Sequence, residues 1–286
     1  MSRLAYVNGR FLPQGEAGVS VEDRGFQFAD AVYEVWAVFD GRLADAEGHF
    51  VRLERSLGEL SIPQPMSRAA LAQVLRETAR RNRVRDGIVY LQISRGAARR
   101  DHAFPAGLRP TVVATARSID YAAEEARAAA GVKVITMPDN RWGRCDIKTV
   151  GLLPNALAKQ AARQAGAYEA WLVDAAGRVT EGASTNAWIV DAQGRLRTRD
   201  TGANILRGVT RSGVAALAER LQIPVIEEPF TVDEAQGASE AFVTAASAFV
   251  LPVVAIDGKP VGSGKPGPVA QRLRALYVEA ARAEAV

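Results

Sequence analysis

The chain has 286 residues, of which 48% are hydrophobic and 24% are charged. These proportions are those of an ordinary globular protein, and they exclude a disordered chain, a coiled coil and a collagen-like repeat. Basic residues outnumber acidic ones by 36 − 32 = 4 and are spread along the chain, so the composition does not indicate a nucleic-acid-binding surface. The single cysteine, Cys145, excludes an internal disulfide, and His49 and His102 add too few ligands for a Cys/His zinc site.

No segment predicts export or membrane insertion. The N-terminal residues MSRLAYVNGRF contain no apolar stretch long enough for a signal peptide. The longest apolar segment, residues 241–255, is interrupted by Thr244, Ser247 and Pro252, and it is shorter than the roughly 20 residues that cross a bilayer. We therefore expect a soluble cytoplasmic protein.

The first part of the chain predicts two hairpins, two helices and two further strands. Asn8-Gly9 and Asp40-Gly41 are residue pairs of tight hairpin turns, and the second pair follows a strand over 31–39. The remaining expected elements are helices over 48–60 and 66–82, the latter capped by Ser67, and strands over 88–96 and 110–118. A polar loop over 96–110 joins these strands, and loops of that length are often functional.

The second part predicts a similar mixture of strands and helices. The alanine-rich segment 119–131 is expected to be a linker between a small N-terminal domain, residues 1–118, and a larger domain, residues 132–286. A strand over 132–136, a helix over 155–167, hairpins over 169–182 and 186–198, a helix after 208, strands over 240–261 and a C-terminal helix follow in turn. This order predicts an α+β (mixed α/β) fold of two domains.

Among the chain's five lysines, Lys148 is the best candidate for amine chemistry. Lys133 and Lys159 are expected on solvated faces, and Lys259 and Lys265 lie in turns. Lys148 instead follows cationic and apolar residues in RWGRCDIKTV, and such surroundings lower the pKa of a lysine and free its amine for Schiff-base chemistry. A solvated or salt-bridged lysine is the structural alternative.

Three other segments contain candidate ligand-binding residues, and none matches a G-x-S-x-G or a nucleotide phosphate loop. Glu181 lies in TEGASTN, whose small residues allow a planar ligand to approach the backbone. Thr210 lies where a helix begins, and helix N-termini bind phosphate; a simple N-cap is the structural alternative. Arg52 lies on the helix HFVRLERS, where a solvated arginine would be ordinary.

Taken together, six segments resemble the class IV aminotransferases, which use pyridoxal phosphate on the fold-type IV scaffold. The segments are EDRGFQFADAVYEV, HFVRLERS, RCDIKTVGLLPNALAKQ, VTEGASTN, LRGVTR and EAFVTAAS. They occur in the family's order and span residues 22 to about 253, nearly the whole chain. Within the family, the D-amino acid transaminases are the most similar.

The resemblance implies a role for each matching residue. Lys148 matches the lysine that forms a Schiff base with the cofactor, and Glu181 matches the carboxylate that keeps the pyridine nitrogen protonated. The other cofactor contacts implied are the phosphate-binding Arg52, Val209 and Thr210, with Leu206 against the ring and Ser184 nearby. A protonated pyridine is an electron sink for the carbanion formed at Cα of the substrate.

The resemblance also implies how the substrate binds. Tyr33 on a strand, with Arg100 and His102 in the loop RGAARRDHAFP, matches the residues that hold the α-carboxylate of a D-amino acid, and Val35 is expected to line the side-chain pocket. In this family the loop reaches the active site of the partner subunit, so the resemblance implies a homodimer. It implies ping-pong transamination of substrates such as D-alanine or D-glutamate, with 2-oxoglutarate or pyruvate as acceptor.

The sequence departs from the family pattern at two places. Ala246 replaces a threonine in the last phosphate-binding turn, which removes a hydroxyl contact worth about 1 kcal/mol, so we expect the cofactor to be held more loosely than in relatives. Ala29 and Ala31 lie where relatives often have glycine, so the backbone there either avoids positive φ or is strained.

Four other functions remain open at this point. A branched-chain L-amino acid aminotransferase, an (R)-amine transaminase and an aminodeoxychorismate lyase share the scaffold. The pairing of Arg100 with His102 argues against the first, and an amine transaminase would lack this carboxylate trap. A non-catalytic pyridoxal phosphate-binding protein is disfavoured because Lys148 and Glu181 are both present.

Overall fold

The computed structural model describes residues 3–286, and these form two compact units. The first unit comprises residues up to Tyr121 together with Ile147–Gly151 and Glu284–Val286, and the second comprises Ala122–Asp146 and Leu152–Ala283. The second segment of the first unit contains Lys148. The division into domains 1–118 and 132–286, joined by a linker over 119–131, stays a prediction. Within the described residues, no helix is long and apolar enough to span a membrane.

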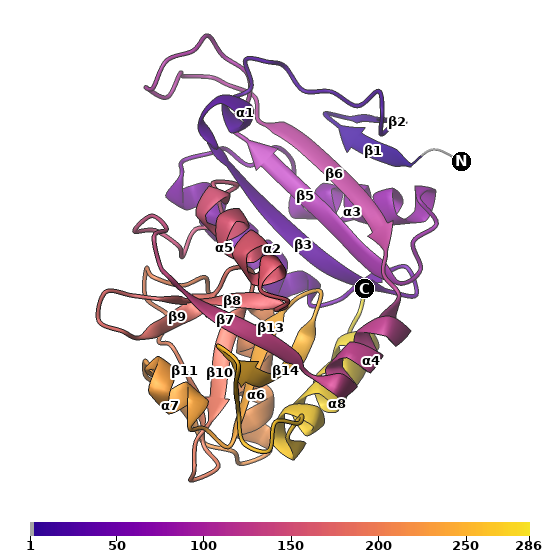
Figure 1. The fold of residues 1–286 in the computed structure, drawn as a ribbon. Helices are drawn as coiled ribbons and strands as arrows, with labels where there is room; N and C mark the ends of the chain where they lie inside the picture. Colours follow the sequence, from indigo (N-terminus) through magenta and orange to yellow (C-terminus); the bar gives the residue numbers. More distant parts are fainter. Residues whose placement is uncertain (1–2) are drawn as a thin grey trace. The chain divides into compact units, whose positions relative to one another are not determined.

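The first unit is built on a six-stranded antiparallel sheet (Figure 1). In spatial order its strands are β2 (Arg10–Pro13), β1 (Leu4–Val7), β6 (Thr111–Ser118), β5 (Gly87–Ser94), β3 (Ala31–Phe39) and β4 (Arg42–Leu43). The longest strand, β3, pairs with β5 from Ala31 opposite Ser94 to Val38 opposite Gly87. The side chains of β3 therefore alternate between the two faces of the sheet over its whole length.

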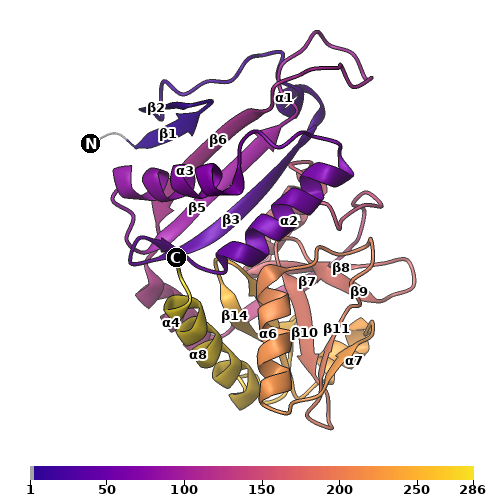
Figure 2. The same cartoon turned by 180° about the vertical axis from the view of Figure 1, so that it is seen from behind.

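Two helices cover one face of this sheet (Figure 2). They are α2 (Ala46–Glu59) and α3 (Arg68–Arg81), and the short helix α1 (Arg24–Phe28) precedes β3. Val32, Trp36 and Val38 of β3 form a buried core with Phe50 and Leu53 of α2. The even-numbered positions of β3 thus pack against the helices.

The second unit contains a nine-stranded mixed sheet (Figure 1). Eight strands follow the order β12 (Val225–Glu227), β11 (Leu196–Thr198), β10 (Asn186–Val190), β13 (Glu240–Ala245), β14 (Phe249–Ile256), β7 (Val132–Pro138), β8 (Glu169–Val173) and β9 (Val179–Gly182). The ninth strand, β15 (Lys259–Pro260), pairs with β14. Parallel pairing occurs between β7 and both of its neighbours and between β11 and β12.

Five helices belong wholly or largely to the second unit. They are α4 (Tyr121–Ala130), α5 (Leu153–Gln164), α6 (Val209–Arg220), α7 (Val232–Gln236) and α8 (Pro268–Ala283). Helix α5 packs on β8 (Figure 1), while α6 and α8 pack against each other and against β13. A separate core includes Trp171, Val243 and Leu251, which are almost fully buried, together with Ala128 of α4 and Ala235 of α7.

The local expectations from the sequence are largely confirmed. Asn8 and Gly9, at φ 45° and 94°, form the turn between β1 and β2, and Ser67 caps α3 by accepting a hydrogen bond from the amide of Ala70. The reading of Thr210 as an N-cap is wrong, because α6 begins at Val209 with Gly208 as its N-cap residue. The mixed α/β fold class is confirmed.

The backbone of Ala29 adopts a positive φ and is therefore strained, which is one of the two outcomes expected for an alanine at this position. It has φ 56° and ψ 25° at the end of α1, whereas Ala31 lies in the extended strand β3. A side chain in the left-handed region costs about 1 kcal/mol or more. We expect Ala29→Gly to raise the free energy of unfolding by relieving this strain. The gain is limited to about 1 kcal/mol, because glycine also increases the conformational entropy of the unfolded chain.

The matched control is Ala31→Gly, which relieves no strain and should lower the free energy of unfolding by about 1 kcal/mol. Urea denaturation of both variants measures these changes. A loss of stability in Ala29→Gly as large as that in Ala31→Gly would show that the left-handed residue is not strained.

Candidate active site

In the first unit, Lys148 is fixed along the edge of β3. The amide of Tyr33 donates to the carbonyl oxygen of Lys148 at 3.0 Å, and the amide of Val150 donates to the carbonyl oxygen of Ala31 at 3.1 Å. On the other side, the Lys148 amide donates to the buried hydroxyl of Ser56 at 3.4 Å. The backbone around Lys148 is therefore held like a short additional strand, which fixes the origin of its side chain.

The Lys148 side chain extends over the aromatic surface formed by the odd-numbered positions of β3. Its Nζ lies 4.1 Å from the centroid of the Tyr33 ring, and the Tyr33 ring stacks on Tyr90 of β5 at 5.7 Å. Val35 follows two residues later on the same face and is half-buried. The structure thus brings Lys148, Tyr33 and Val35 together.

Arg52 is oriented by a carboxylate that the sequence did not single out. Its Nε and Nη2 donate to Glu34 Oε1 and Oε2 at 2.7 and 2.8 Å, in a forked ion pair. Glu34 is fully buried on the helix-facing side of β3, and His49 Nδ1 lies 2.8 Å from Oε2. Burial lowers the pKa of His49 despite the nearby carboxylate, so at neutral pH it serves as a neutral donor to Glu34.

The buried Glu34 makes stability depend on pH. Burial alone would raise the pKa of Glu34, but Arg52 and His49 outweigh it and hold the pKa far below its usual range. Because the unfolded chain binds this proton near pH 4.5, the contribution is present above that pH and is lost as the pH falls. We expect the free energy of unfolding to drop by up to about 1.4 kcal/mol per pH unit below this point.

Glu34→Gln should make the free energy of unfolding depend less on pH below about 4.5. It should also lower this free energy at neutral pH, since it removes the Glu34 charge from the forked ion pair with Arg52. Denaturant titrations from about pH 3 to 7 measure the slope, with the exposed Glu16→Gln as control. An unchanged slope in Glu34→Gln would contradict the role given to this carboxylate.

In the second unit, Glu181 on β9 is a buried carboxylate held by several donors. The amide of Leu206 lies 3.1 and 3.2 Å from its two oxygens, and Asn186 Nδ2 donates to Oε2 at 2.9 Å. Asn186 Nδ2 also donates to the carbonyl oxygen of Leu206 at 2.9 Å, so the three residues form one network. This arrangement fixes an anionic group at a defined position beside the start of α6.

Arg141 completes the surroundings of Glu181, and sequence reasoning did not assign it a role. Its Nη1 donates to Glu181 Oε1, while Nε and Nη2 donate to Asp139 at 2.9 and 2.8 Å. Burial would lower the pKa of Arg141, but the two carboxylates outweigh it and raise the pKa. Arg141 therefore stays charged and places a guanidinium against the Glu181 carboxylate.

The N-terminus of α6 presents backbone amides with no side-chain cap. Thr210 is buried in the first turn, and Tyr277 Oη donates to its Oγ1 at 3.4 Å. Gly208 is required here, because a Cβ at this residue would lie 2.1 Å from Asn186 Oδ1. Close packing thus connects the Glu181 network to Val209 and Thr210.

The two remaining predicted cofactor residues of this unit lie in turns. Ala246 is half-buried in the turn between β13 and β14. Ser184 is exposed after β9, and its hydroxyl donates to the buried Glu169 Oε2 at 2.6 Å. Lys159 Nζ lies 3.4 Å from the same oxygen. The Lys159 side chain is therefore ion-paired with Glu169 while remaining 42% exposed.

Arg100 and His102 lie in the loop that connects β5 to β6, and both are exposed. The guanidinium carbon of Arg100 lies 4.6 Å from the centroid of the Phe28 ring, and the His102 ring lies 5.4 Å from the same ring. Phe28, at the end of α1, therefore brings the two side chains to one place.

Cys145 is a half-buried free cysteine close to Lys148 in sequence. Burial raises the pKa of its thiol to about 11, and Sγ lies 3.1 Å from the carbonyl oxygen of Trp142. The thiol therefore stays protonated at neutral pH.

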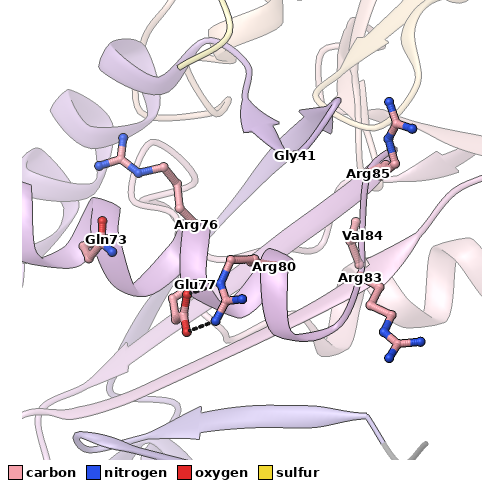
Figure 3. A pocket seen from close by; sticks show the side chains of 8 residues that line it. All are labelled: Gly41, Gln73, Arg76, Glu77, Arg80, Arg83, Val84 and Arg85. Atoms are coloured by element: carbon pink, nitrogen blue, oxygen red, sulfur yellow. Dashed lines mark hydrogen bonds and ion pairs between the residues drawn. The ribbon is translucent and has the colours of Figure 1, made fainter.

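A pocket of about 430 Å³ lies elsewhere in the first unit, beside α3 (Figure 3). It is lined by Gly41, Gln73, Arg76, Glu77, Arg80, Arg83, Val84 and Arg85. Its arginines are exposed, and Glu77 and Asp40 pair with two of them at 2.6 Å. None of the predicted site residues lines this pocket, so it is separate from the candidate active site.

Comparisons with known proteins identify the family of the chain. Residues 31–256 match the model of the family described as amino-transferase class IV. The chain is 41% identical over 267 residues to a D-alanine aminotransferase of Bacillus licheniformis, covering 93% of each chain. It is 40% identical to the D-alanine aminotransferase of Staphylococcus haemolyticus, covering 94% of each.

Solved structures of the same fold include branched-chain amino acid aminotransferases. The T.th. enzyme, in its structure with pyridoxamine 5'-phosphate, has a TM-score of 0.90 and 30% identity, covering 99% of this chain and 95% of that chain. The enzyme of Escherichia coli has a TM-score of 0.89 and 25% identity, with coverage of 99% and 96%. The chain belongs to the class IV aminotransferases, as the six sequence segments indicated.

Proposed function

We propose that this protein catalyses pyridoxal phosphate-dependent transamination of D-amino acids such as D-alanine or D-glutamate, with 2-oxoglutarate or pyruvate as acceptor. The observation that carries the proposal is the loop holding Arg100 and His102 beside Phe28, in a chain 41% identical to a D-alanine aminotransferase. The two half-reactions follow a ping-pong course, because donor and acceptor use the same site in turn.

The described residues fit this cofactor. Glu181 is a buried carboxylate suited to a protonated pyridine nitrogen. The uncapped N-terminus of α6, with the Thr210 hydroxyl, suits a phosphate, and Gly208 leaves this turn free of a Cβ. Arg52, oriented by Glu34, supplies a charged phosphate contact, with Leu206 against the ring and Ser184 nearby. When bound, the cofactor withdraws electrons from the substrate Cα.

Lys148 is the residue that moves the proton in this proposal. With the cofactor bound, the Lys148 amine would act as the general base that moves the proton at the substrate Cα. The fixed backbone along β3 limits the positions that Nζ can reach. Tyr33, whose ring lies 4.1 Å from Nζ, restricts the amine further from one side.

Substrate recognition is assigned to the loop and to β3. Tyr33, Arg100 and His102 bind the α-carboxylate, since a guanidinium and a hydroxyl are strong donors to this group. Val35 lines the space for the substrate side chain. We also propose a homodimer in which the exposed loop approaches the partner's active site, so that each site is completed by both subunits.

The replacement at Ala246 predicts weak retention of the cofactor. A phosphate-binding turn that presents only a backbone amide lacks one hydroxyl contact, worth about 1 kcal/mol or more. We expect Ala246→Thr to lower the dissociation constant of pyridoxal phosphate about fivefold or more and to slow its loss on dialysis. Equal retention by the wild type and the variant would show that this turn does not bind the phosphate.

Absorbance spectroscopy of the holoenzyme tests the proposed substrate class directly. D-alanine should convert the bound pyridoxal form to the pyridoxamine form, whereas L-leucine should leave it unchanged. Conversion by L-leucine alone would assign the protein to the branched-chain enzymes, which its structural neighbours make the second candidate. If an amine that has no carboxylate converted the pyridoxal form as efficiently as D-alanine does, the carboxylate-binding role proposed for Arg100 and His102 would be contradicted.

A further inference from the structure

The loop that carries Arg100 and His102 is anchored at its base to the segment before β3. The amide of Arg24 donates to the carbonyl oxygen of Gly96 at 2.9 Å, and that of Ala98 donates to the carbonyl oxygen of Glu22 at 3.2 Å. Gly96 has φ 110°, and a Cβ there would lie 2.2 Å from the carbonyl oxygen of Arg109. The two ends of the loop are therefore closed tightly against each other.

Beyond its base, the backbone of the loop is bound by the side chain of Arg24. Its Nη1 lies 2.5 Å from the carbonyl oxygen of Asp101 and 3.3 Å from that of Ala103. Its Nη2 lies 3.3 Å from the carbonyl oxygen of His102. One guanidinium thus binds three consecutive carbonyls, and the middle one belongs to a predicted substrate-binding residue.

Arg24 is itself fixed in place. It is 2% exposed, and its Nε donates to Asp30 Oδ2 at 2.8 Å. Arg95 binds the same carboxylate at 2.7 and 3.0 Å, and it donates to the carbonyl oxygens of Leu60 and Ser61. Asp30 therefore joins Arg24 to a second buried arginine that is tied to the end of α2.

Aromatic rings extend this support to the loop side chains. The Arg95 guanidinium lies 3.5 Å from the centroid of the Phe104 ring, and the Arg24 guanidinium lies 4.8 Å from that of Phe28. Phe28 in turn contacts Arg100 and His102. A cation over an aromatic face is attracted by the ring, most strongly where water is excluded.

We infer that Arg24 is a positioning residue for Arg100 and His102, and that it sets the affinity for the substrate carboxylate without contacting the substrate. The inference rests on the proposed function, because it acts through the carboxylate-binding pair. An exposed loop of this length samples many conformations unless its backbone is bound. Holding the carbonyls of residues 101–103 reduces the ordering that substrate binding would otherwise require.

The test is Arg24→Lys in the holoenzyme. Lysine keeps the positive charge beside Asp30, but an ammonium cannot reproduce the planar fork that reaches three carbonyls. We expect KM for D-alanine and for pyruvate to rise about tenfold, with kcat changed less than about twofold. The control is Arg68→Lys, which alters another forked arginine of the same unit, bound to Glu54 and Glu47, and should leave both constants unchanged.

A double-variant comparison separates positioning from general structural support. In the R100A/H102A background, Arg24→Lys should raise KM by less than about twofold. The effect of Arg24 is expected to act through Arg100 and His102, which this background lacks. An additional tenfold rise there, or an unchanged KM in the single variant, would overturn the inference. If R100A/H102A itself leaves KM unchanged, the proposed carboxylate site fails, and the inference fails with it.

Phe28→Leu provides a second variant should Arg24→Lys not fold. It keeps the apolar character of α1 and removes the ring shared by Arg24, Arg100 and His102. We expect KM to rise about threefold with kcat maintained, and the rise to vanish in the R100A/H102A background. A KM equal to that of the wild type would contradict the inference.

Discussion

Lys148→Ala should reduce transamination of D-alanine by about 10⁴-fold or more. Proton transfer by a positioned group contributes typically about 10² to 10⁴ in rate, and Lys148 is also the proposed covalent attachment point of the cofactor. No other lysine can replace it, because the remaining four lie on other elements or turns. Pyruvate release with D-alanine as donor measures the loss.

Borohydride reduction gives a readout that does not depend on turnover. Treating the holoenzyme should attach the cofactor irreversibly to the peptide that contains Lys148, and mass mapping should find no such adduct in Lys148→Ala. Lys133→Ala, an exposed lysine on β7, is the matched control and should retain both adduct and activity. Turnover by Lys148→Ala at the wild-type rate would refute the proposed chemistry.

Glu181→Gln should lower kcat by about 10²- to 10³-fold while leaving the fold intact. Removing one charge-stabilising group from an active site typically has an effect of this size. The amide keeps the shape of the side chain, and Asp139 continues to bind Arg141, so the buried arginine is not left without a carboxylate. Single-turnover kinetics with D-alanine would show the loss in the step that removes the Cα proton.

Asp139→Asn separates the two carboxylates that share Arg141. It retains Glu181 and its contacts with Asn186 and Leu206, so we expect kcat to fall much less than in Glu181→Gln. Equal losses in the two variants would indicate that the ion-pair network as a whole is needed, and not the Glu181 carboxylate in particular.

The sequence predicts local structure well because its signals are local. The Asn8-Gly9 turn, the capped start of α3 at Ser67 and the alternation along β3 each depend on a few neighbouring residues. The N-cap assigned to Thr210 is wrong because Gly208 gives no side-chain signal, and this glycine is selected by a non-local contact, its close approach to Asn186.

The supporting residues of the site could not be predicted from the sequence in the same way. Lys148, Glu181 and Arg52 lie in segments that resemble a family, so they could be named. Glu34 and Arg141 act through partners 18 and 40 residues away, and an ordinary strand or loop position gives no sign of such contacts. Their roles can be recognised only in the structure, where each side chain is buried and a buried charge requires an opposite charge beside it.

The path of the chain around Lys148 has a consequence for how the molecule can be divided. Five residues, Ile147–Gly151, leave the second unit to pair with β3 and then return to begin α5. A cut after Tyr121 would therefore produce one fragment with the strand but no lysine, and another with the lysine but no strand. Lys148, to which we assign the chemistry, belongs by sequence to one fragment and by hydrogen bonding to the other. When the ribosome has made the chain only as far as Tyr121, the first unit still lacks the segment that pairs with β3. That segment, Ile147–Gly151, begins 26 residues further along the chain.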